Sequence, residues 1–334
     1  MYLRHYALRE APFELTPNPA YLYLTAQHRE ALANLQYGLS TAKPVTLLIG
    51  EAGTGKTTLL RTALESAACK HVRSVHLTNP TLSRNEFVEA LARAFGLSAA
   101  ASVSKAAFLA ELEPFLRDRR KDGLITALVV DEAQRLSEDL LEEVRLLANI
   151  ETDTEKLLPL VLAGQPELAE KLNQTGLRQL KQRVALRCEI RPFTLPETAA
   201  YIAYRIRCAG GEAARLFTRE AVMLIHEHSH GVARTISVIC DNALVSGFAA
   251  GCQPVGRDLI LEVVRDFDLS HSTLSGGSQL ILDSSREEGP ILTDPEGVGS
   301  ADSDEPVRAV SERPRRFSIF GMAQRRTGGG ETPA

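Results

Sequence analysis

Gly50-Glu51-Ala52-Gly53-Thr54-Gly55-Lys56-Thr57 is the stretch that decides the fold of this 334-residue chain. It follows an apolar run at Val45 to Ile49 and precedes a helix-like segment that begins at Thr58. The pattern G-x-x-x-x-G-K-[ST] between a strand and a helix is a phosphate-binding loop. It predicts that the chain binds a nucleoside triphosphate; the alternative is a chance match in a glycine-rich turn.

The residue types in this loop suit a triphosphate. Glycine lets the backbone curl so that successive N–H groups face phosphate oxygens, and the following helix contributes its positive end. We expect Lys56 on the β and γ oxygens and the Thr57 hydroxyl on Mg²⁺, which prefers oxygen ligands. The predicted nucleotide-binding residues of the loop are Gly50, Glu51, Ala52, Gly53, Thr54, Gly55, Lys56, Thr57 and Thr58.

The composition is that of an ordinary globular protein, with 44% hydrophobic and 24% charged residues. A formal net charge of -4 offers no global electrostatic reason to expect nucleic-acid binding. The five cysteines include no C-x-x-C pair, which argues against a disulfide framework or a zinc site. No leader segment or membrane span is evident, so we expect a cytoplasmic protein.

Strand-like and helix-like patterns alternate around the loop. An aromatic, proline-punctuated and extended segment is followed by a helix at about 25–39. Further strand patterns lie at 72–78, 124–130 and 158–163, and further helices at about 83–95, 104–119 and 137–149. This alternation predicts an α/β fold with a parallel sheet covered by helices on both faces.

The pattern changes to helices alone from Thr194, where Thr194, Pro196 and Glu197 form a helix-start motif. Further helices are expected at about 218–228, 232–247 and 256–267, so a small all-helical lid domain follows the core. The predicted divisions are an N-terminal segment and helix at 1–40, an ATPase core at 41–192, the lid at 193–268 and a disordered, polar tail at 269–334.

Two carboxylates end the strand at 124–130. Asp131 is expected to hold the Mg²⁺ shell, and Glu132 to orient or deprotonate the attacking water. A solvated helix start often carries such a pair, but its place about 75 residues beyond the loop favours a Walker B element. Gln165, after the next strand, is expected to sense the γ-phosphate. The alternative is that Gln165 only begins a helix, before Pro166.

Arginines in two segments are candidates for contacts with phosphate. The segment Leu177 to Arg187 is basic and predicted to be helical, and Arg183 is our choice for an arginine that reaches the γ-phosphate of a neighbouring subunit. Arg178 and Arg187 are competitors, and a solvated basic face is the alternative. Arg234 lies in the first turn of a helix, where a cation is unfavourable unless an anion is near.

These motifs, in order over about the first 268 residues, resemble the ATPase domain of the ExeA/GspA-type secretion proteins, AAA+ ATPases related to the origin-recognition and transposition-regulator ATPases. The residues that carry this resemblance are Tyr2-Leu3 through Ala11-Pro12-Phe13, Tyr21-Leu22-Tyr23, the loop at 50–58, Asp131-Glu132-Ala133-Gln134, Leu146 to Glu151, Gly164 to Leu168, Arg178 to Leu180 with Gln182-Arg183, and Gly231 to Arg234.

The resemblance implies ATP and Mg²⁺ as cofactors, with Lys56, Glu132, Gln165, Arg183 and Arg234 as catalytic residues. It also implies a homo-oligomer with ATP at subunit interfaces, Arg183 coming from the neighbouring subunit and Arg234 acting as a second sensor in the lid.

The resemblance further implies a role in assembling an envelope secretion, pilus or exopolysaccharide system, through an inner-membrane partner that recruits this protein from the cytoplasm. The membrane span and periplasmic domain of the secretion proteins are not expected here. The alternative is a DNA-associated AAA+ switch of the transposition or initiation kind, motivated by the basic stretch at 178–187. A third reading is a scaffold that binds ATP and hardly hydrolyses it, which Glu132 disfavours.

Overall fold

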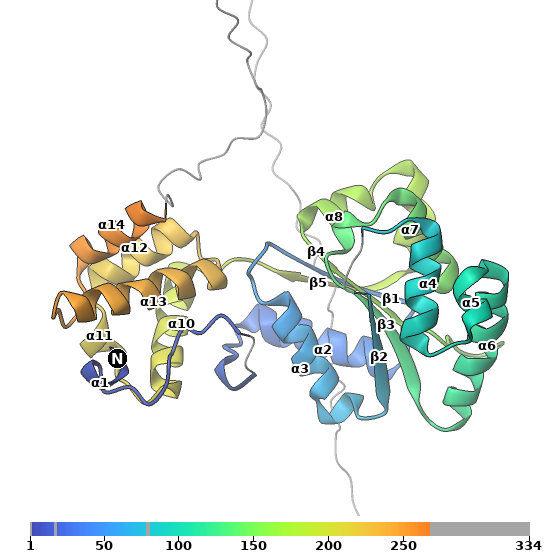
Figure 1. Ribbon diagram of the computed structural model, residues 1–334, viewed down its shortest axis with the longest axis horizontal. Coiled ribbons are helices and arrows are strands. Elements are labelled where there is room, and N and C mark those ends of the chain that lie inside the picture. Colours follow the sequence, from blue (N-terminus) through green and yellow to red (C-terminus); the bar gives the residue numbers. More distant parts are fainter. Residues whose placement is uncertain (1, 17–18, 78–80, 268–334) are drawn as a thin grey trace, which may run out of the picture. The chain divides into compact units, whose positions relative to one another are not determined.

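A five-stranded parallel sheet organises the first part of the chain (Figure 1). The computed structural model describes residues 2–16, 19–77 and 81–267. The strands follow the order β2-β3-β4-β1-β5 across the sheet. They are β1 (Val45–Gly50), β2 (Val72–Leu77), β3 (Ile125–Val130), β4 (Leu160–Gly164) and β5 (Val184–Ile190). The predicted α/β fold with a parallel sheet is therefore confirmed, and the loop after β1 lies between the ends of β4 and β5.

Helices cover both faces of this sheet. Leu48 belongs to a hydrophobic cluster with residues of α2 and α3 on one face, and Leu47 belongs to the cluster of the other face with residues of α4, α6 and α7. Consecutive residues of a strand point to opposite faces, so a strand buried on both sides is apolar throughout, as β1 is. The helices of this part are α2 (Ala26–Ser40), α3 (Lys56–Glu65), α4 (Arg84–Phe95), α5 (Ala99–Val103), α6 (Lys105–Lys121), α7 (Glu138–Leu147), α8 (Pro166–Lys171) and α9 (Arg178–Arg183).

The basic segment predicted to be helical up to Arg187 is a helix only to Arg183. From Val184 the chain forms β5, which pairs with β1. Alternate residues of β5 are exposed, among them Arg187 and Glu189, while Cys188 faces the core. Since β1 is its only described neighbour, β5 is an edge strand, and this alternation replaces the continuous apolar run of a central strand. The helical prediction was wrong for residues 184–187.

The predicted helical lid is confirmed and has its own hydrophobic core. Its helices are α10 (Leu195–Cys208), α11 (Ala213–Leu216), α12 (Arg219–Ser229), α13 (Ala233–Ala249) and α14 (Arg257–Asp266). Glu197 accepts a hydrogen bond of 2.9 Å from the Thr194 N–H, as expected for the start of α10. The predicted tail at 269–334 lies outside the described residues.

The N-terminal segment packs into the lid core. Tyr6, Leu8 and Phe13 are buried among the lid helices, and residues 2–5, which were expected to be extended, form the short helix α1 (Tyr2–His5). Arg205 of α10 holds the segment in place: its guanidinium donates to the Pro12 and Glu14 carbonyl oxygens. The Ala20 carbonyl oxygen accepts a hydrogen bond from the Tyr204 hydroxyl, and the Tyr23 ring packs against Phe193 and Tyr201, so the lid also contacts the part of the segment next to α2.

Gly231 allows the lid to pack closely against the backbone of Phe193, just before α10. Its φ is +75°, and its carbonyl oxygen accepts a 2.8 Å hydrogen bond from the Phe193 N–H. A Cβ at this position would lie 2.0 Å from the Phe193 carbonyl oxygen. Backbone must therefore move to accept any side chain here.

We expect Gly231→Ala to lower the free energy of unfolding by more than about 2 kcal/mol, because left-handed strain and a backbone clash add together. Gly96→Ala is the matched control: φ is +73°, and nothing lies within 4 Å of the added Cβ. The control should lose only about 1 kcal/mol. Urea denaturation compares the two variants, and equal losses would contradict the proposed clash.

Candidate nucleotide-binding site

The phosphate-loop sequence forms a tight connection between β1 and α3. Gly53 and Gly55 have φ of +80° and +97°, values that favour glycine. Gly55 is the N-cap of α3, and no side chain caps the helix there. The first N–H groups of α3 therefore lack side-chain acceptors, and a helix start of this kind binds anions.

Lys56 is buried at the start of α3, with 5% of its surface exposed. Its Nζ donates to the carbonyl oxygens of Gly50 at 2.8 Å and Glu51 at 2.9 Å. Burial lowers the pKa of Lys56, and the nearby carboxylates of Glu132 and Asp131 oppose that effect. An ammonium group is thus held beside the loop amides.

The predicted Mg²⁺ ligands lie together across the sheet edge. The Thr57 Oγ1 donates to Asp131 Oδ2 at 2.9 Å, although the two residues are 74 positions apart in the chain. The other oxygen of Asp131 accepts from the Glu132 N–H at 2.9 Å. A hydroxyl beside a carboxylate is the oxygen-rich donor set that Mg²⁺ takes.

Glu132 and Gln165 meet at the ends of β3 and β4. Gln165 Nε2 donates to Glu132 Oε2 at 3.3 Å, and Gln134 Nε2 donates to the same oxygen at 2.6 Å. Burial raises the pKa of Glu132, but the two amide hydrogen bonds and the charge of Lys56 outweigh it, so the pKa lies below its usual value. Gln165 is also the N-cap of α8, yet its side chain makes no capping hydrogen bond. Its side chain instead faces Glu132.

A cleft of about 450 Å³ collects residues from the loop, the lid and the N-terminal segment. Arg234, predicted to act from the lid, lines this cleft, and its backbone N–H donates to the Gly53 carbonyl oxygen at 3.1 Å. The lid therefore touches the phosphate loop directly. The cleft is lined by Ala52 to Thr58, Glu132, Arg234 and residues that the sequence analysis did not assign to the site: Glu14 to Thr16, Tyr21 to Tyr23, His28, Phe193, Tyr201, Arg205, Ala233 and Ser237.

His28 is the clearest of the missed residues. It is 3% exposed, and its ring nitrogens lie 2.7 Å from Thr25 Oγ1 and 3.5 Å from the Thr54 carbonyl oxygen. Burial lowers the pKa of His28. A single histidine in the predicted helix at 25–39 carries no motif, so only the three-dimensional structure shows that it reaches the loop.

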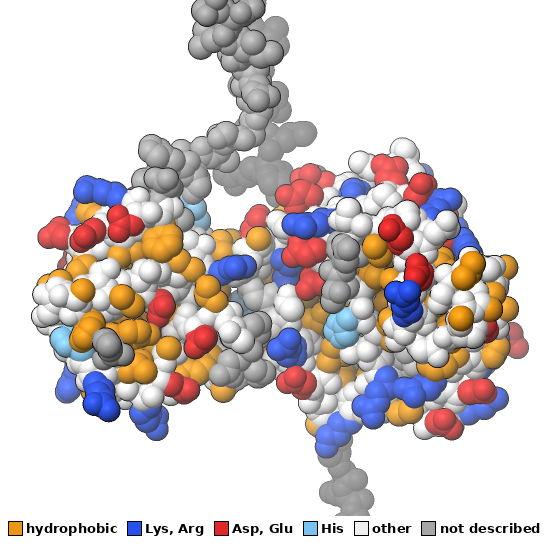
Figure 2. Space-filling view, in the orientation of Figure 1, with side chains coloured by type: hydrophobic (Ala, Val, Ile, Leu, Met, Phe, Trp, Pro, Cys, Tyr) orange, Lys and Arg blue, Asp and Glu red, His pale blue; other side chains and the backbone are white. Residues whose placement is uncertain are grey.

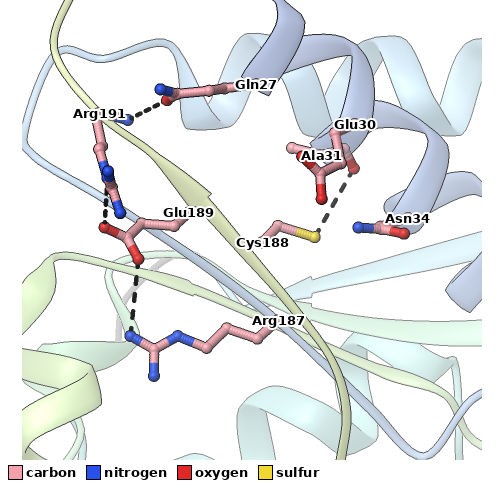
Figure 3. A pocket seen from close by; sticks show the side chains of 8 residues that line it. All are labelled: Gln27, Glu30, Ala31, Asn34, Arg187, Cys188, Glu189 and Arg191. Carbon is pink, nitrogen blue, oxygen red and sulfur yellow. Dashed lines mark hydrogen bonds and ion pairs between the residues drawn. The ribbon is translucent and has the colours of Figure 1, made fainter. Parts of the chain in front are cut away.

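Arg183 and its two competitors do not line this cleft. Arg183 ends α9; the pKa of Glu151 is lowered mainly by Lys156, and the charge of Arg183 adds to that effect. Arg187 lines a different cleft of about 300 Å³ between α2 and β5 (Figure 3). There Glu189 lies between Arg187 and Arg191, at 4.0 and 3.0 Å. None of the predicted phosphate-loop residues lines that second cleft.

The parallel sheet, the phosphate loop and the helical lid define a P-loop protein of the AAA+ class. Residues 40–172 match the AAA domain family. The chain has the AAA+ fold and is similar to general secretion pathway protein A of Aeromonas hydrophila, with which it shares 39% identity over 259 residues. This alignment covers 76% of the chain and 46% of the relative, so the chain spans less than half the length of the curated relative that it matches.

Solved structures at low sequence identity share the fold. Cdc6p of Pyrobaculum aerophilum superimposes with a TM-score of 0.60 at 19% identity, covering 76% of this chain and 70% of that one. The ORC2 protein of Aeropyrum pernix, solved as ADPNP-ADP complexes, gives a TM-score of 0.58 at 19% identity and coverages of 77% and 71%. Drosophila ORC bound to DNA gives 0.56 at 19%, with coverages of 77% and 64%. These likenesses support the AAA+ fold alone.

Proposed function

We propose that this chain is a Mg²⁺-dependent ATPase whose nucleotide-driven rearrangement of lid and oligomer drives or regulates assembly of an envelope secretion, pilus or exopolysaccharide system. The observation that carries the ATPase part is the convergence of Lys56, Glu132 and Arg234 on one cleft. Three distant segments supply an ammonium, a carboxylate and a guanidinium there.

The residues present fit a nucleoside triphosphate with Mg²⁺. Lys56 and the loop amides would bind the β- and γ-phosphates, and Thr57 and Asp131 would hold the metal ion, which supplies neutralising charge when bound. Glu132 would accept a proton from the attacking water, because its low pKa keeps it ionised near neutral pH. Gln165 would orient the same water from the end of β4.

Arg234 is the residue through which we propose that the lid responds to nucleotide. It lies at the start of α13, and its backbone contact with Gly53 fixes its distance from the loop. A cation at the positive end of a helix becomes favourable when a phosphate group lies beside it. Closure of the lid would therefore depend on the γ-phosphate.

An oligomer supplies the remaining charge in this proposal. Arg183 lies outside its own cleft, so we assign it to the γ-phosphate of a neighbouring subunit. Arg178 and Arg187 remain the competing candidates.

The secretion role is supported by the likeness to general secretion pathway protein A. Among the described residues, no helix is long and apolar enough to cross a membrane. On the strength of that likeness, we propose that an inner-membrane secretion or polysaccharide-export component recruits this protein from the cytoplasm.

The DNA-associated alternative has less support. Acidic and basic side chains both occur across the face in Figure 2, rather than one continuous basic surface. The structural neighbours that include DNA-bound ORC share the fold at 19% identity only.

A hydrolysis assay with and without duplex DNA separates the two functions. We expect release of phosphate from ATP that requires Mg²⁺, rises with protein concentration as oligomers form, and does not respond to DNA. The DNA alternative predicts acceleration that weakens steeply as salt rises. Absence of Mg²⁺-dependent hydrolysis at any protein concentration would refute the ATPase proposal.

A further inference from the structure

Gln134 connects the two residues that we expect to handle the attacking water. It lies in the short 3-10 turn Ala133–Arg135 that follows β3. Its Nε2 donates to Glu132 Oε2 at 2.6 Å, and its Oε1 accepts from the Gln165 backbone N–H at 3.2 Å. Gln165 Nε2 closes the set by donating to the same Glu132 oxygen at 3.3 Å. One amide side chain thus joins the ends of β3 and β4.

The surrounding backbone holds this amide in place. Lys171 of α8 donates to the carbonyl oxygens of Gln134 at 2.9 Å and Leu136 at 2.8 Å, which secures the turn. At the end of β4, a Cβ on Gly164 would lie 2.9 Å from Gln134 Oε1. Glycine at that position therefore leaves room for the Gln134 side chain between the two strands.

The backbone conformation of Glu132 is also unusual. Glu132 has φ of +53°, a left-handed conformation that is costly for a residue with a side chain. Within the described part of the chain, both amide contacts fall on Oε2. These contacts leave Oε1 as the oxygen that we assign to the water.

We propose that Gln134 is a positioning residue for hydrolysis: it sets the Glu132 carboxylate relative to Gln165, so that both engage the same water. This inference rests on the ATPase activity proposed above. Small errors in the placement of a catalytic group cost large factors in rate, whereas binding of the triphosphate depends on Lys56 and the loop amides, which Gln134 does not touch.

Two substitutions separate the two hydrogen-bonding roles of Gln134. Gln134→Leu keeps a similar size and removes both roles. Gln134→Glu keeps an acceptor for the Gln165 N–H but replaces the amide donor by a carboxyl group that repels Glu132 when both are ionised. We expect kcat to fall by about 10-fold to 100-fold in both variants, with the Kd for ATP within about threefold of wild type.

Hydrogen exchange supplies a readout that does not depend on activity. The Gln165 backbone N–H should exchange faster in Gln134→Leu than in wild type and should remain protected in Gln134→Glu. Gln174→Leu is the control, because Gln174 is exposed and its side chain makes no capping hydrogen bond. That control should match wild type in kcat, Kd and exchange.

Each outcome is decisive. An unchanged or raised kcat in Gln134→Leu, or unchanged exchange at Gln165, would overturn the inference, as would a loss of activity explained by weaker ATP binding. If wild type itself does not hydrolyse ATP, the proposed function fails, and the exchange measurement then tests the Gln134 to Gln165 contact by itself.

Discussion

Glu132→Gln should reduce ATP turnover by about 10² to 10⁴-fold, while the protein still binds ATP within about threefold of the wild-type affinity. The substitution keeps the size of the side chain and one acceptor oxygen, so the Gln134 amide still has a partner. It removes the carboxylate that accepts a proton from water. Replacing this one carboxylate oxygen should therefore greatly reduce turnover while leaving ATP binding almost unchanged.

Single-turnover hydrolysis and equilibrium binding of a fluorescent ATP analogue measure the two effects independently. Glu170→Gln is the matched control, because Glu170 is exposed in α8 and lies outside the cleft that holds Glu132. Turnover in Glu132→Gln close to that of the control would show that another group activates the water. A large loss of affinity would show instead that Glu132 is needed to bind nucleotide.

The features that could be predicted from the sequence are those that a short stretch of chain determines by itself. Eight residues specify the phosphate loop, because its glycine conformations and the helix start that follows are local properties. One apolar strand is followed by Asp131 and another ends at Gly164, which predicts that Glu132 and Gln165 lie at one sheet edge. The hydrogen bond between them agrees with this expectation.

The errors and omissions have physical causes. Residues 184–187 of β5 were taken as helical because the charged residues of this segment hid an alternation of Val184, Leu186, Cys188 and Ile190 with more exposed positions. This alternation with a period of two is the sequence signal that would have indicated a strand. Contacts such as those of Gln134 with Gln165, or of Arg205 with the N-terminal segment, join positions 31 and about 190 residues apart, and no local pattern encodes them.

The domain boundaries and the assigned roles of the site residues stay predictions. The structure adds a reason to consider the lid and the N-terminal segment together, since Tyr6, Leu8 and Phe13 share a core with α10 to α14. Movement of the lid would then also move the residues at 14–16 that line the cleft.

Lys56→Ala should weaken ATP binding by more than about 100-fold, the largest effect on affinity that we expect from one substitution. A buried ammonium next to phosphate oxygens interacts in a low dielectric, where charge-assisted hydrogen bonds are strong. In the protein alone, Lys56 bonds two loop carbonyl oxygens, and its burial costs free energy that these contacts offset. Removing it should therefore change the free energy of unfolding by only about 1 kcal/mol.

Isothermal titration calorimetry with ATP and Mg²⁺, together with urea denaturation, distinguishes lost binding from lost folding. Lys70→Ala is the control, since Lys70 is exposed beyond α3 and lies outside the cleft. Glu132→Gln and Lys56→Ala together separate binding from hydrolysis: the first should bind ATP without turnover, and the second should not bind it. Retained affinity in Lys56→Ala would contradict the assignment of the loop at 50–57, because no other buried ammonium lines the described cleft.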